Sequence, residues 1–202
     1  MDTREKMHSG GVYHCNDASL IAEQRECLEV LYDFNHSRPS QVAQKEQLLH
    51  RLLGGVGKEC YIEPPLHANW GRNTYVGNCF YANFNLTLVD DTVISIGDHV
   101  MIGPNVTLTT AGHPVDPDRR RNVAQFNLPI TIEDNVWIGA NVVVLPGVSI
   151  GENSVIGAGS IVTKDVPSNV VAVGNPCRVL REISERDKVF YHQQCRFDEG
   201  LS

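Results

Sequence analysis

The sequence predicts an all-β-dominated chain whose main part is a parallel β-helix, and three observations lead to this prediction. An apolar residue returns every six positions through much of the second half, and a series of small or β-branched residues follows it four positions later. One long segment interrupts both series. Because three six-residue steps make a triangular coil of 18 residues, such a chain stacks short parallel strands coil upon coil.

The two series define which side chains should fill the interior. The first series reads Ile132, Ile138, Val144, Ile150, Ile156 and Val162, and its phase occurs earlier at Ile96, Ile102 and Leu108. The second reads Val136, Val142, Val148, Ser154, Ser160 and Val166. A β-sandwich is the structural alternative, but it would show period-two alternation with turns of variable length.

Helices are expected at both ends of the repeats. The first begins at Asp17 as N-cap and carries apolar positions Leu20, Ile21, Leu28, Leu31 and Phe34. The second follows Pro39 and Ser40, ends at Gly54 and Gly55, and carries Val42, Leu48, Leu49, Leu52 and Leu53. We therefore expect a helical cap at 1–57, a β-helix domain at 58–183, and a tail at 184–202 with a short helix near 184–192.

Composition narrows the classes of partner. The chain has 202 residues and a net charge of -7, which argues against a nucleic-acid or anionic-membrane surface, since either needs a concentrated basic field. No stretch approaches the roughly 18 apolar residues that span a bilayer, and the start MDTREKMHSG lacks the apolar segment of a signal peptide. Six cysteines occur without a C-x-x-C pair, which is typical of reduced, structural thiols. These features predict a cytoplasmic protein.

The interruption of the repeat, residues 109–131, predicts a functional loop. Loops of this length without structure of their own often carry function. His113 lies at its entrance, and imidazole is the side chain that titrates near neutral pH without perturbation, so His113 is a candidate general base. The chain has eight histidines, however, and composition alone does not single this one out.

From Phe34 to about Ile183 the chain resembles the galactoside and maltose acetyltransferase group of the hexapeptide-repeat acyltransferases. Six motifs carry the resemblance in the correct order: FNHSRPS (34–40), YIEPP (61–65), YANFNLTLVDD (81–91), GHPVDP (112–117), NVWIGANVVVLPGVSIGENSVIGAGSIVTKDVP (135–167) and GNPCRVLREI (174–183). The resemblance implies a left-handed β-helix, a homotrimer with active sites between subunits, and transfer of an acetyl group from acetyl-CoA to a sugar hydroxyl.

The resemblance also implies roles for particular residues. His113 is the expected catalytic base, and Asn69, Asn83 and Asp91 are the expected sugar contacts. Expected cofactor contacts are Asn83, Ala140, Ala158, Thr163, Lys164, Arg178 and Arg181, with Ala140 offering only its backbone N–H. Turn chemistry for Asn83 and a solvated corner for Asp91 are the structural alternatives. Cys15 stands where a close relative has a sugar-binding aspartate, and Asp17 is a candidate substitute.

Two other functions are weighed against this one. Some hexapeptide β-helices carry zinc-dependent, carbonic anhydrase-like sites, which need three converging histidines. His99 and His113 are fourteen positions apart and no His-x4-His pair occurs, so we predict no metal site. A catalytically silent trimeric scaffold would have no need of the loop histidine or the basic cofactor positions. The identity of the sugar acceptor stays open.

Overall fold

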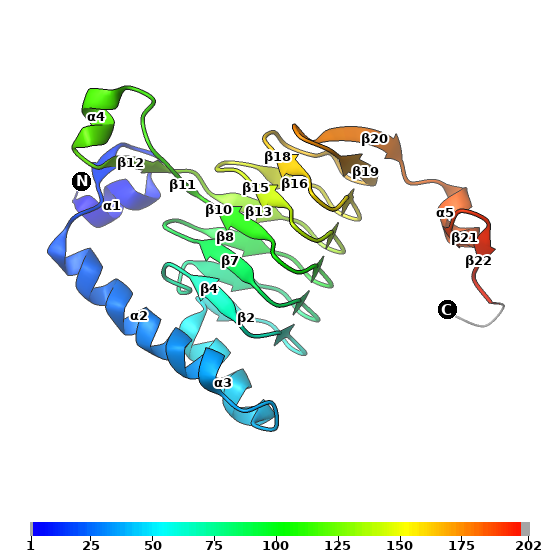
Figure 1. Cartoon of the computed structure of the whole chain (residues 1–202), viewed down its shortest axis with the longest axis horizontal. Coiled ribbons are helices and arrows are strands. Elements are labelled where there is room, and N and C mark those ends of the chain that lie inside the picture. The colour runs from blue at the N-terminus through cyan, green and yellow to red at the C-terminus, as the bar shows by residue number, and fades with distance from the viewer. Residues whose placement is uncertain (1, 199–202) are drawn as a thin grey trace.

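The computed structural model describes residues 2–198 and confirms the parallel β-helix (Figure 1). Short strands from successive coils form three sheets. The first sheet contains β2 (Gly55–Val56), β5 (Thr74–Val76), β8 (Ile94–Ile96), β13 (Ile130–Ile132) and β16 (Ser149–Ile150). The second contains β3 (Tyr61–Ile62), β6 (Tyr81–Ala82), β9 (Met101–Ile102), β14 (Trp137–Ile138), β17 (Val155–Ile156) and β19 (Val170–Val173), with β20 (Arg178–Glu182) antiparallel to β19. The third contains β4 (Leu66–Ala68), β7 (Leu86–Val89), β10 (Thr107–Thr109), β15 (Val143–Val144) and β18 (Ile161–Val162).

Both predicted series of apolar and small residues face the interior. Every member of the first series has 1% exposure or less, and every member of the second has 7% or less. The pairing register stacks equivalent residues, as in the file formed by Ile102, Ile138 and Ile156. The first coils are longer, since Tyr81 pairs with Tyr61 twenty positions earlier while Val155 pairs with Trp137 eighteen positions earlier. The six-residue phase is therefore regular only after the first coils.

Asparagines hold the corners of the coils. Asn135, Asn153 and Asn169 all adopt left-handed backbone conformations, with φ of 57°, 60° and 61°. Asparagine tolerates this region better than most residues because its short amide bonds locally. The Asn135 amide donates to Asn153 at 2.9 Å, and Asn153 donates to Asn169 at 2.9 Å. This ladder ties each coil to the next at the same corner.

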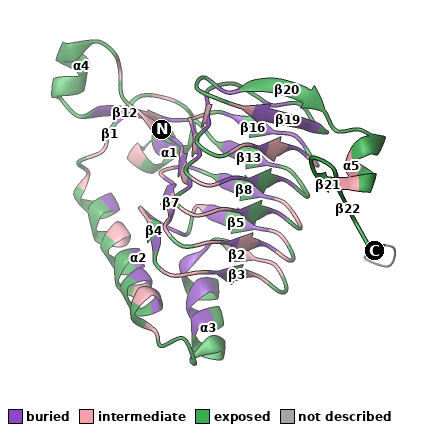
Figure 2. Ribbon diagram, turned by 45° about the vertical axis from the view of Figure 1, so that its right-hand side comes forward, coloured by how far each residue is buried: buried purple, intermediate pink, exposed green. Residues whose placement is uncertain are grey.

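Helices cover the N-terminal end of the stack (Figure 2). They are α2 (Ala18–His36) and α3 (Val42–Leu52), preceded by α1 (Thr3–His8) and strand β1 (Tyr13–His14). Asp17 caps α2 as expected, accepting a hydrogen bond from Ser19 N. The predicted apolar face is wrong at Ile21, Leu28 and Val42, which are 44%, 43% and 59% exposed. Cys27 takes a place on the buried face instead, because the spacing from Leu20 through Cys27 to Leu31 keeps one stripe against the core.

The interruption of the repeat has structure of its own, contrary to the expectation of a plain loop. It contains β11 (Ala111–Gly112), α4 (Pro117–Arg121) and β12 (Ala124–Asn127). Strand β12 pairs antiparallel with β11 on one side and with β1 on the other. The excursion therefore folds back onto the N-terminal segment, beside the coil stack (Figure 1).

The C-terminal segment leaves the stack after β20 (Figure 1). The helix expected near 184–192 is shorter, because α5 (Glu185–Val189) gives way to a small hairpin of β21 (Phe190–His192) and β22 (Cys195–Arg196). The end of the predicted tail, 199–202, lies outside the described residues. Among residues 2–198, no helix has the length and apolar character needed to cross a bilayer.

The interior of the β-helix should not accept a charge. Ile150 is fully buried, so Ile150→Asp places an unpaired carboxylate among aliphatic side chains and should cost several kcal/mol of unfolding free energy. Thr131→Asp is the matched control, since Thr131 is exposed on the adjacent strand and pairs in register with Ser149. Thermal denaturation should show a large loss for the first variant and little change for the second. Equal midpoints would contradict the interior assignment.

Candidate active site

Six of the expected site residues lie on the two edges of the third sheet. Asn69 follows β4, Asp91 follows β7, and His113 follows β10 and β11, so these three share the edge where the chain leaves this sheet. Asn83 precedes β7, Ala140 precedes β15 and Ala158 precedes β18, so these lie on the edge where the chain enters it. The structure thus separates these six residues into two groups.

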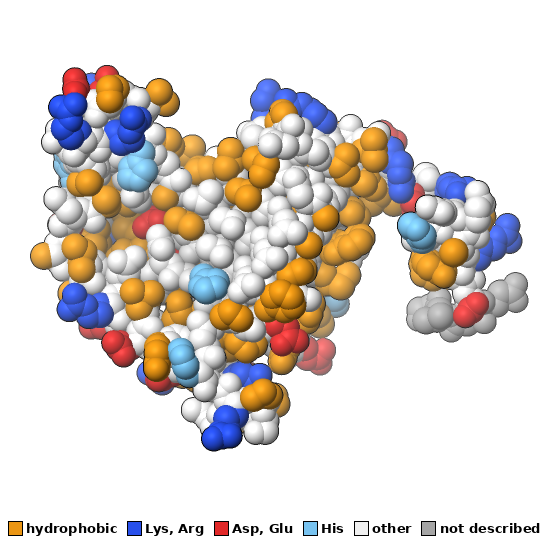
Figure 3. Space-filling model, in the orientation of Figure 1, with side chains coloured by type: hydrophobic (Ala, Val, Ile, Leu, Met, Phe, Trp, Pro, Cys, Tyr) orange, Lys and Arg blue, Asp and Glu red, His pale blue; other side chains and the backbone are white. Residues whose placement is uncertain are grey.

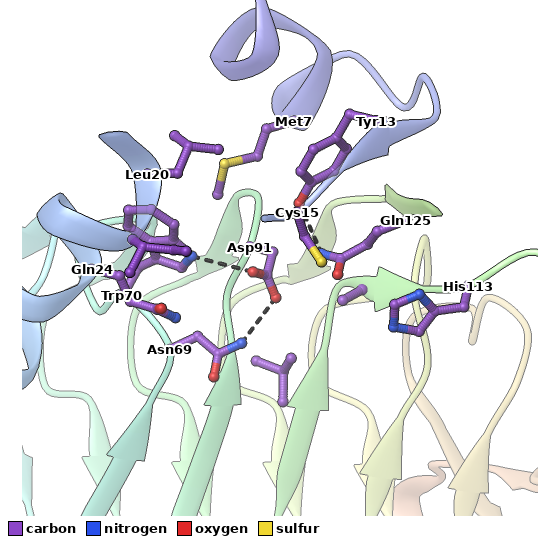
Figure 4. A pocket seen from close by; sticks show the side chains of 13 residues that line it. Met7, Tyr13, Cys15, Leu20, Gln24, Asn69, Trp70, Asp91, His113 and Gln125 are labelled. Carbon is purple, nitrogen blue, oxygen red and sulfur yellow. Dashed lines mark hydrogen bonds between the residues drawn. The ribbon is translucent and has the colours of Figure 1, made fainter. Parts of the chain in front are cut away.

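A cavity of about 310 Å³ lies at the first of these edges (Figure 4). Its size falls in the lower part of the roughly 300–1,000 Å³ range of small-molecule sites. Asn69, Asp91 and His113 line it, together with residues that, apart from Cys15, the sequence did not connect with a sugar site. These additional residues are Met7, Tyr13, Cys15, Leu20, Ile21, Gln24, Trp70, Val89, Ala111 and Gln125.

The imidazole of His113 is fixed by one hydrogen bond. Its Nδ1 lies 2.8 Å from the backbone carbonyl of Ala124, on β12. A carbonyl oxygen only accepts, so Nδ1 carries the proton and the neutral ring keeps a lone pair on Nε2. Because Ala124 is buried in the excursion, this bond holds the ring beside the cavity, and within residues 2–198 Nε2 has no hydrogen-bond partner.

Asp91 lies opposite, between two donors (Figure 4). The Asn69 amide donates to Asp91 Oδ2 at 3.0 Å, and the Trp70 indole N–H donates to Oδ1 at 3.2 Å. These bonds orient the carboxylate toward the cavity and leave lone pairs on both oxygens. An ionised carboxylate only accepts, so Asp91 suits a ligand hydroxyl that donates. The solvated-corner alternative does not fit these contacts.

The neighbouring Asp90 is fully buried and serves the backbone. It accepts from Trp70 N at 2.8 Å and from the Thr74 hydroxyl at 3.1 Å. Burial is the largest effect on this carboxyl and raises its pKa from 3.8 to about 6, although hydrogen bonds from Trp70 and Gly71 act in the opposite direction. Asp90 thus holds the turn that presents Asp91.

The raised pKa of Asp90 should make stability depend on pH. Since the folded pKa exceeds the unfolded one, the stabilisation from the protonated form is complete below about pH 4 and is lost as the pH rises through 6. Asp90→Asn cannot ionise, and its amide can still accept from Trp70 N and donate to Thr74. From pH 4 to pH 7, the unfolding free energy of the variant relative to wild type should therefore rise by about 2 kcal/mol.

Chemical denaturation of both proteins at several pH values measures this difference. Asp98→Asn is the control, because backbone and side-chain hydrogen bonds from Asn78 lower the pKa of Asp98. The unfolding free energy of Asp98→Asn relative to wild type should fall, rather than rise, as the pH increases. A pH-independent difference for Asp90→Asn would show that burial does not dominate this carboxyl.

The second edge of the third sheet is a tightly packed corner. A Cβ on Gly103 would lie 2.8 Å from Ala140 N, and one on Gly139 would lie 2.7 Å from Ala158 N, so glycine is required for the coils to approach there. Asn85 donates to Asn105 at 2.9 Å in a second asparagine ladder. Asn83 accepts from Phe84 N at 2.8 Å through its carbonyl end. Asn83 therefore makes the local turn contact that the structural alternative predicted. This contact uses its carbonyl oxygen and leaves its NH₂ group for another partner.

The basic residues expected at the cofactor do not all lie together. Lys164 and Arg178 line a second cavity of about 270 Å³, with Asp165, Val166, Cys177 and Val179. Figure 3 shows Lys and Arg side chains gathered at this end of the stack, above β18 and β20. Thr163 is exposed next to Lys164. Arg181 instead forms a two-bond ion pair with Asp187, at 2.8 and 2.7 Å, which holds the pKa of that carboxyl well below its usual range.

In the N-terminal segment the sequence indicated only Cys15 and Asp17 as candidate positions for a sugar contact. Cys15 lines the main cavity, whereas Asp17 is used as the N-cap of α2. Tyr13 and Gln125 are 112 positions apart and meet only because β1 pairs with β12. Polar residues in β12 offered a weak signal, since Gln125 and Asn127 alternate with Ala124 and Phe126 in a segment that otherwise looks like a loop. Nothing in the sequence identified the partner strand.

The alternative metal function gains no support from the described residues. Within 2–198, no group of three or more His, Cys, Asp and Glu side chains is arranged to hold a metal ion.

Comparisons with known proteins identify the family. Residues 6–57 match the maltose acetyltransferase hexapeptide capping motif, and residues 129–164 match the hexapeptide repeat of succinyl-transferase. The chain is 47% identical over 201 residues to galactoside O-acetyltransferase of Escherichia coli (strain K12), covering 100% of this chain and 99% of the relative. It is 50% identical over 199 residues to galactoside O-acetyltransferase of Lactococcus lactis subsp. lactis (strain IL1403), covering 98% and 96%.

Solved structures of acetyltransferases match the fold of this chain as well. A galactoside acetyltransferase in complex with coenzyme A matches with a TM-score of 0.96 and 48% identity, covering 98% of this chain and 100% of that one. A maltose O-acetyltransferase from Clostridium difficile 630 matches with a TM-score of 0.90 and 44% identity, covering 92% and 99%. The chain therefore belongs to the hexapeptide-repeat acetyltransferase family, in its group of galactoside and maltose O-acetyltransferases.

Proposed function

We infer that this chain is an acetyl-CoA-dependent O-acetyltransferase that acts on a sugar hydroxyl, with His113 as the general base. The observation that carries the assignment is the free Nε2 of His113 in a cavity shared with Asp91 and Asn69. A carboxylate and an amide in fixed positions suit the directional hydrogen bonds of sugar hydroxyls. The family supplies the donor, because a relative is known in complex with coenzyme A.

The chemistry follows from these positions. As the acceptor oxygen attacks the thioester carbonyl carbon, Nε2 takes the hydroxyl proton and the ring becomes imidazolium, still donating through Nδ1 to Ala124. The tetrahedral intermediate carries an oxyanion, and the backbone N–H of Ala140 is the proposed donor to it. When the carbon–sulfur bond breaks, the imidazolium returns the proton to the departing thiolate. The products are the sugar ester and coenzyme A.

The division of the site between two edges supports a homotrimer. His113 and Ala140 lie on opposite edges of the third sheet in one chain. A substrate held at His113 meets Asn83 and Ala140 only if a neighbouring copy brings its other edge alongside. In this proposal each active site therefore lies between two subunits, and a cyclic trimer closes the arrangement.

The cofactor is proposed to run from this junction toward the C-terminal end of the stack. Ala158, Thr163 and Lys164 follow one another along the last coils, and Lys164 shares its cavity with Arg178. Lys164 and Arg178 supply the local positive charge that phosphates need in a chain of net charge -7. Arg181 would contact the nucleotide only after releasing Asp187, so its contribution is proposed to be smaller than that of Arg178.

The proposal also includes a cellular compartment for the protein and a division of the chain into three segments. Six free cysteines fit a reducing cytoplasm. We keep the division into a cap at 1–57, a catalytic β-helix at 58–183 and a tail from 184. In this division the cap contributes directly to the site, because Met7, Tyr13 and Cys15 line the cavity of His113.

Loss of the general base should remove turnover without removing the fold. We expect His113→Ala to lower kcat by roughly 10²-fold or more with sugar acceptors. The His113 side chain is exposed on the excursion, outside the β-helix interior, so sedimentation and calorimetric binding of coenzyme A should be little changed. His14→Ala is the matched control, because His14 Nδ1 also bonds a backbone carbonyl, that of Asn122, at 2.8 Å but does not line this cavity. Near-normal kcat in His113→Ala would rule out the mechanism.

A shared site can be tested by mixing two inactive variants. If His113 and Asn83 of one site come from different subunits, co-expressed His113→Ala and Asn83→Ala chains should form some intact sites, about a quarter of the total for random trimers. Co-expression of His113→Ala with Asp91→Ala is the control, since His113 and Asp91 line one cavity in one chain. That pair should restore no activity. If the first pair also restored none, the arrangement between subunits would be wrong.

A further inference from the structure

We propose that Tyr13 is a specificity-determining residue of the acceptor site, where its hydroxyl donates a hydrogen bond to an oxygen of the sugar. This proposal rests on the acceptor cavity assigned above and adds a residue from the N-terminal segment to it. Figure 4 shows the Tyr13 ring hanging from that segment, with its hydroxyl end directed toward Asp91 and Gln125.

The direction of hydrogen bonding around Tyr13 is fixed by a chain of contacts. Asn127 Nδ2 lies 3.0 Å from the backbone oxygen of Met7, which only accepts, so the amide orientation of Asn127 is determined. Its Oδ1 then faces Gln125 Nε2 at 3.0 Å, which determines the orientation of Gln125. Each amide therefore presents an N–H to Tyr13.

Both nitrogens that contact the phenol oxygen are amide donors. Gln125 Nε2 donates to the Tyr13 hydroxyl at 2.8 Å, and Asn127 Nδ2 lies 3.0 Å from it, with its two hydrogens shared among this hydroxyl, Met7 O at 3.0 Å and Asp91 O at 3.3 Å. A hydroxyl has two acceptor lone pairs and one proton. Because an amide nitrogen donates and does not accept, neither amide can take the phenol proton, which therefore points away from both. Among the described residues, the structure contains no acceptor for that proton.

The surroundings make this proton significant for a ligand. Tyr13 is only 4% exposed, and an unpaired polar hydrogen in such a place is costly unless a ligand or water accepts it. Tyr13, Gln125, Asp91 and His113 all line the same cavity. Burial raises the pKa of Tyr13 to about 12, so the phenol stays protonated at neutral pH.

The acceptor site then has two neighbouring groups of opposite hydrogen-bonding sense. Asp91 accepts, so it requires a sugar hydroxyl that donates, whereas Tyr13 donates, so it requires an oxygen that accepts. A sugar hydroxyl, the ring oxygen or the carbonyl of an acylamino group can fill the second role. A sugar without an oxygen at that position should therefore be a poor substrate, even if its other hydroxyls are correct.

The test combines one residue change with a series of acceptors. Tyr13→Phe keeps the ring and removes the proton, and kcat/KM is measured with the parent sugar and with its single deoxy and fluoro analogues. With the parent sugar we expect a loss of roughly 3- to 10-fold, the range for one neutral hydrogen bond. The loss should vanish for the one deoxy analogue that lacks the accepting oxygen. For wild type, the fluoro analogue at that position should be better than the deoxy analogue, because fluorine accepts but does not donate.

A second variant guards against a structural effect, since Tyr13→Phe leaves the Gln125 and Asn127 amides without an acceptor. Gln125→Leu retains Tyr13 but frees one of its lone pairs, so the hydroxyl can rotate and accept. Discrimination between the parent sugar and the critical deoxy analogue should then fall, while the KM for acetyl-CoA stays unchanged. Tyr32→Phe, on an exposed part of α2, is the control for loss of a phenol elsewhere.

The possible outcomes separate this inference from the function it rests on. Absence of wild-type turnover with every sugar would count against the sugar acetyltransferase assignment. Wild-type turnover with a Tyr13→Phe effect that is equal for all analogues would overturn the role of Tyr13 alone, and so would no effect at all. If Tyr13→Phe does not fold, equal discrimination by wild type and Gln125→Leu overturns it in the same way.

Discussion

The site depends on the register with which each coil bonds to the one before it. Backbone pairs such as Thr107 with Thr87 and with Val143 keep equivalent positions of the third sheet in line, and the asparagine ladders repeat this alignment at the corners. A slip by one residue would exchange interior and exterior side chains in every following coil. Because the register is fixed, the ends of successive strands lie above one another. Asn69 continues β4 directly after the pair of Ala68 with Leu88, and Asp91, which follows the end of β7, accepts from the Asn69 amide.

His113, the proposed general base, lies outside this regular system, and its position depends on the excursion. Strand β12 bonds to β1 on one side and to β11 on the other, so the excursion is clamped between the N-terminal segment and the coil that it leaves. The same strand supplies Ala124 O to His113 and the Gln125 amide to Tyr13. Orientation of the base and of the proposed specificity residue thus share one support.

The sequence predicted the regular parts well and the irregular parts poorly. The six-residue period identified the interior residues from Ile132 to Val162. Equivalent positions of each coil face the same interior, so the same kind of residue recurs at each of them. The period also located the interruption. The site residues that the family motifs indicate lie on both edges of the third sheet, and their roles stay predictions. The places of Tyr13 and Gln125 in the cavity could not be predicted, because their pairing occurs once and spans 112 positions. Ile21 and Leu28 were placed on the buried face of α2 for a related reason: apolar residues indicate a face only when the partner surface is known.

The split between regular and irregular parts has a consequence for specificity. Positions fixed by the coils, such as Ala140 and Asp91, cannot move without disturbing every neighbouring coil, so the acetyl-transfer geometry is coupled to the stability of the whole stack. The N-terminal segment makes fewer such contacts and reaches the cavity through Met7, Tyr13 and Cys15. Substitutions there change the shape and hydrogen-bonding sense of the acceptor side while leaving the base and the coil edges in place. An enzyme built this way can alter its acceptor by changes in the first 20 residues without altering the reaction.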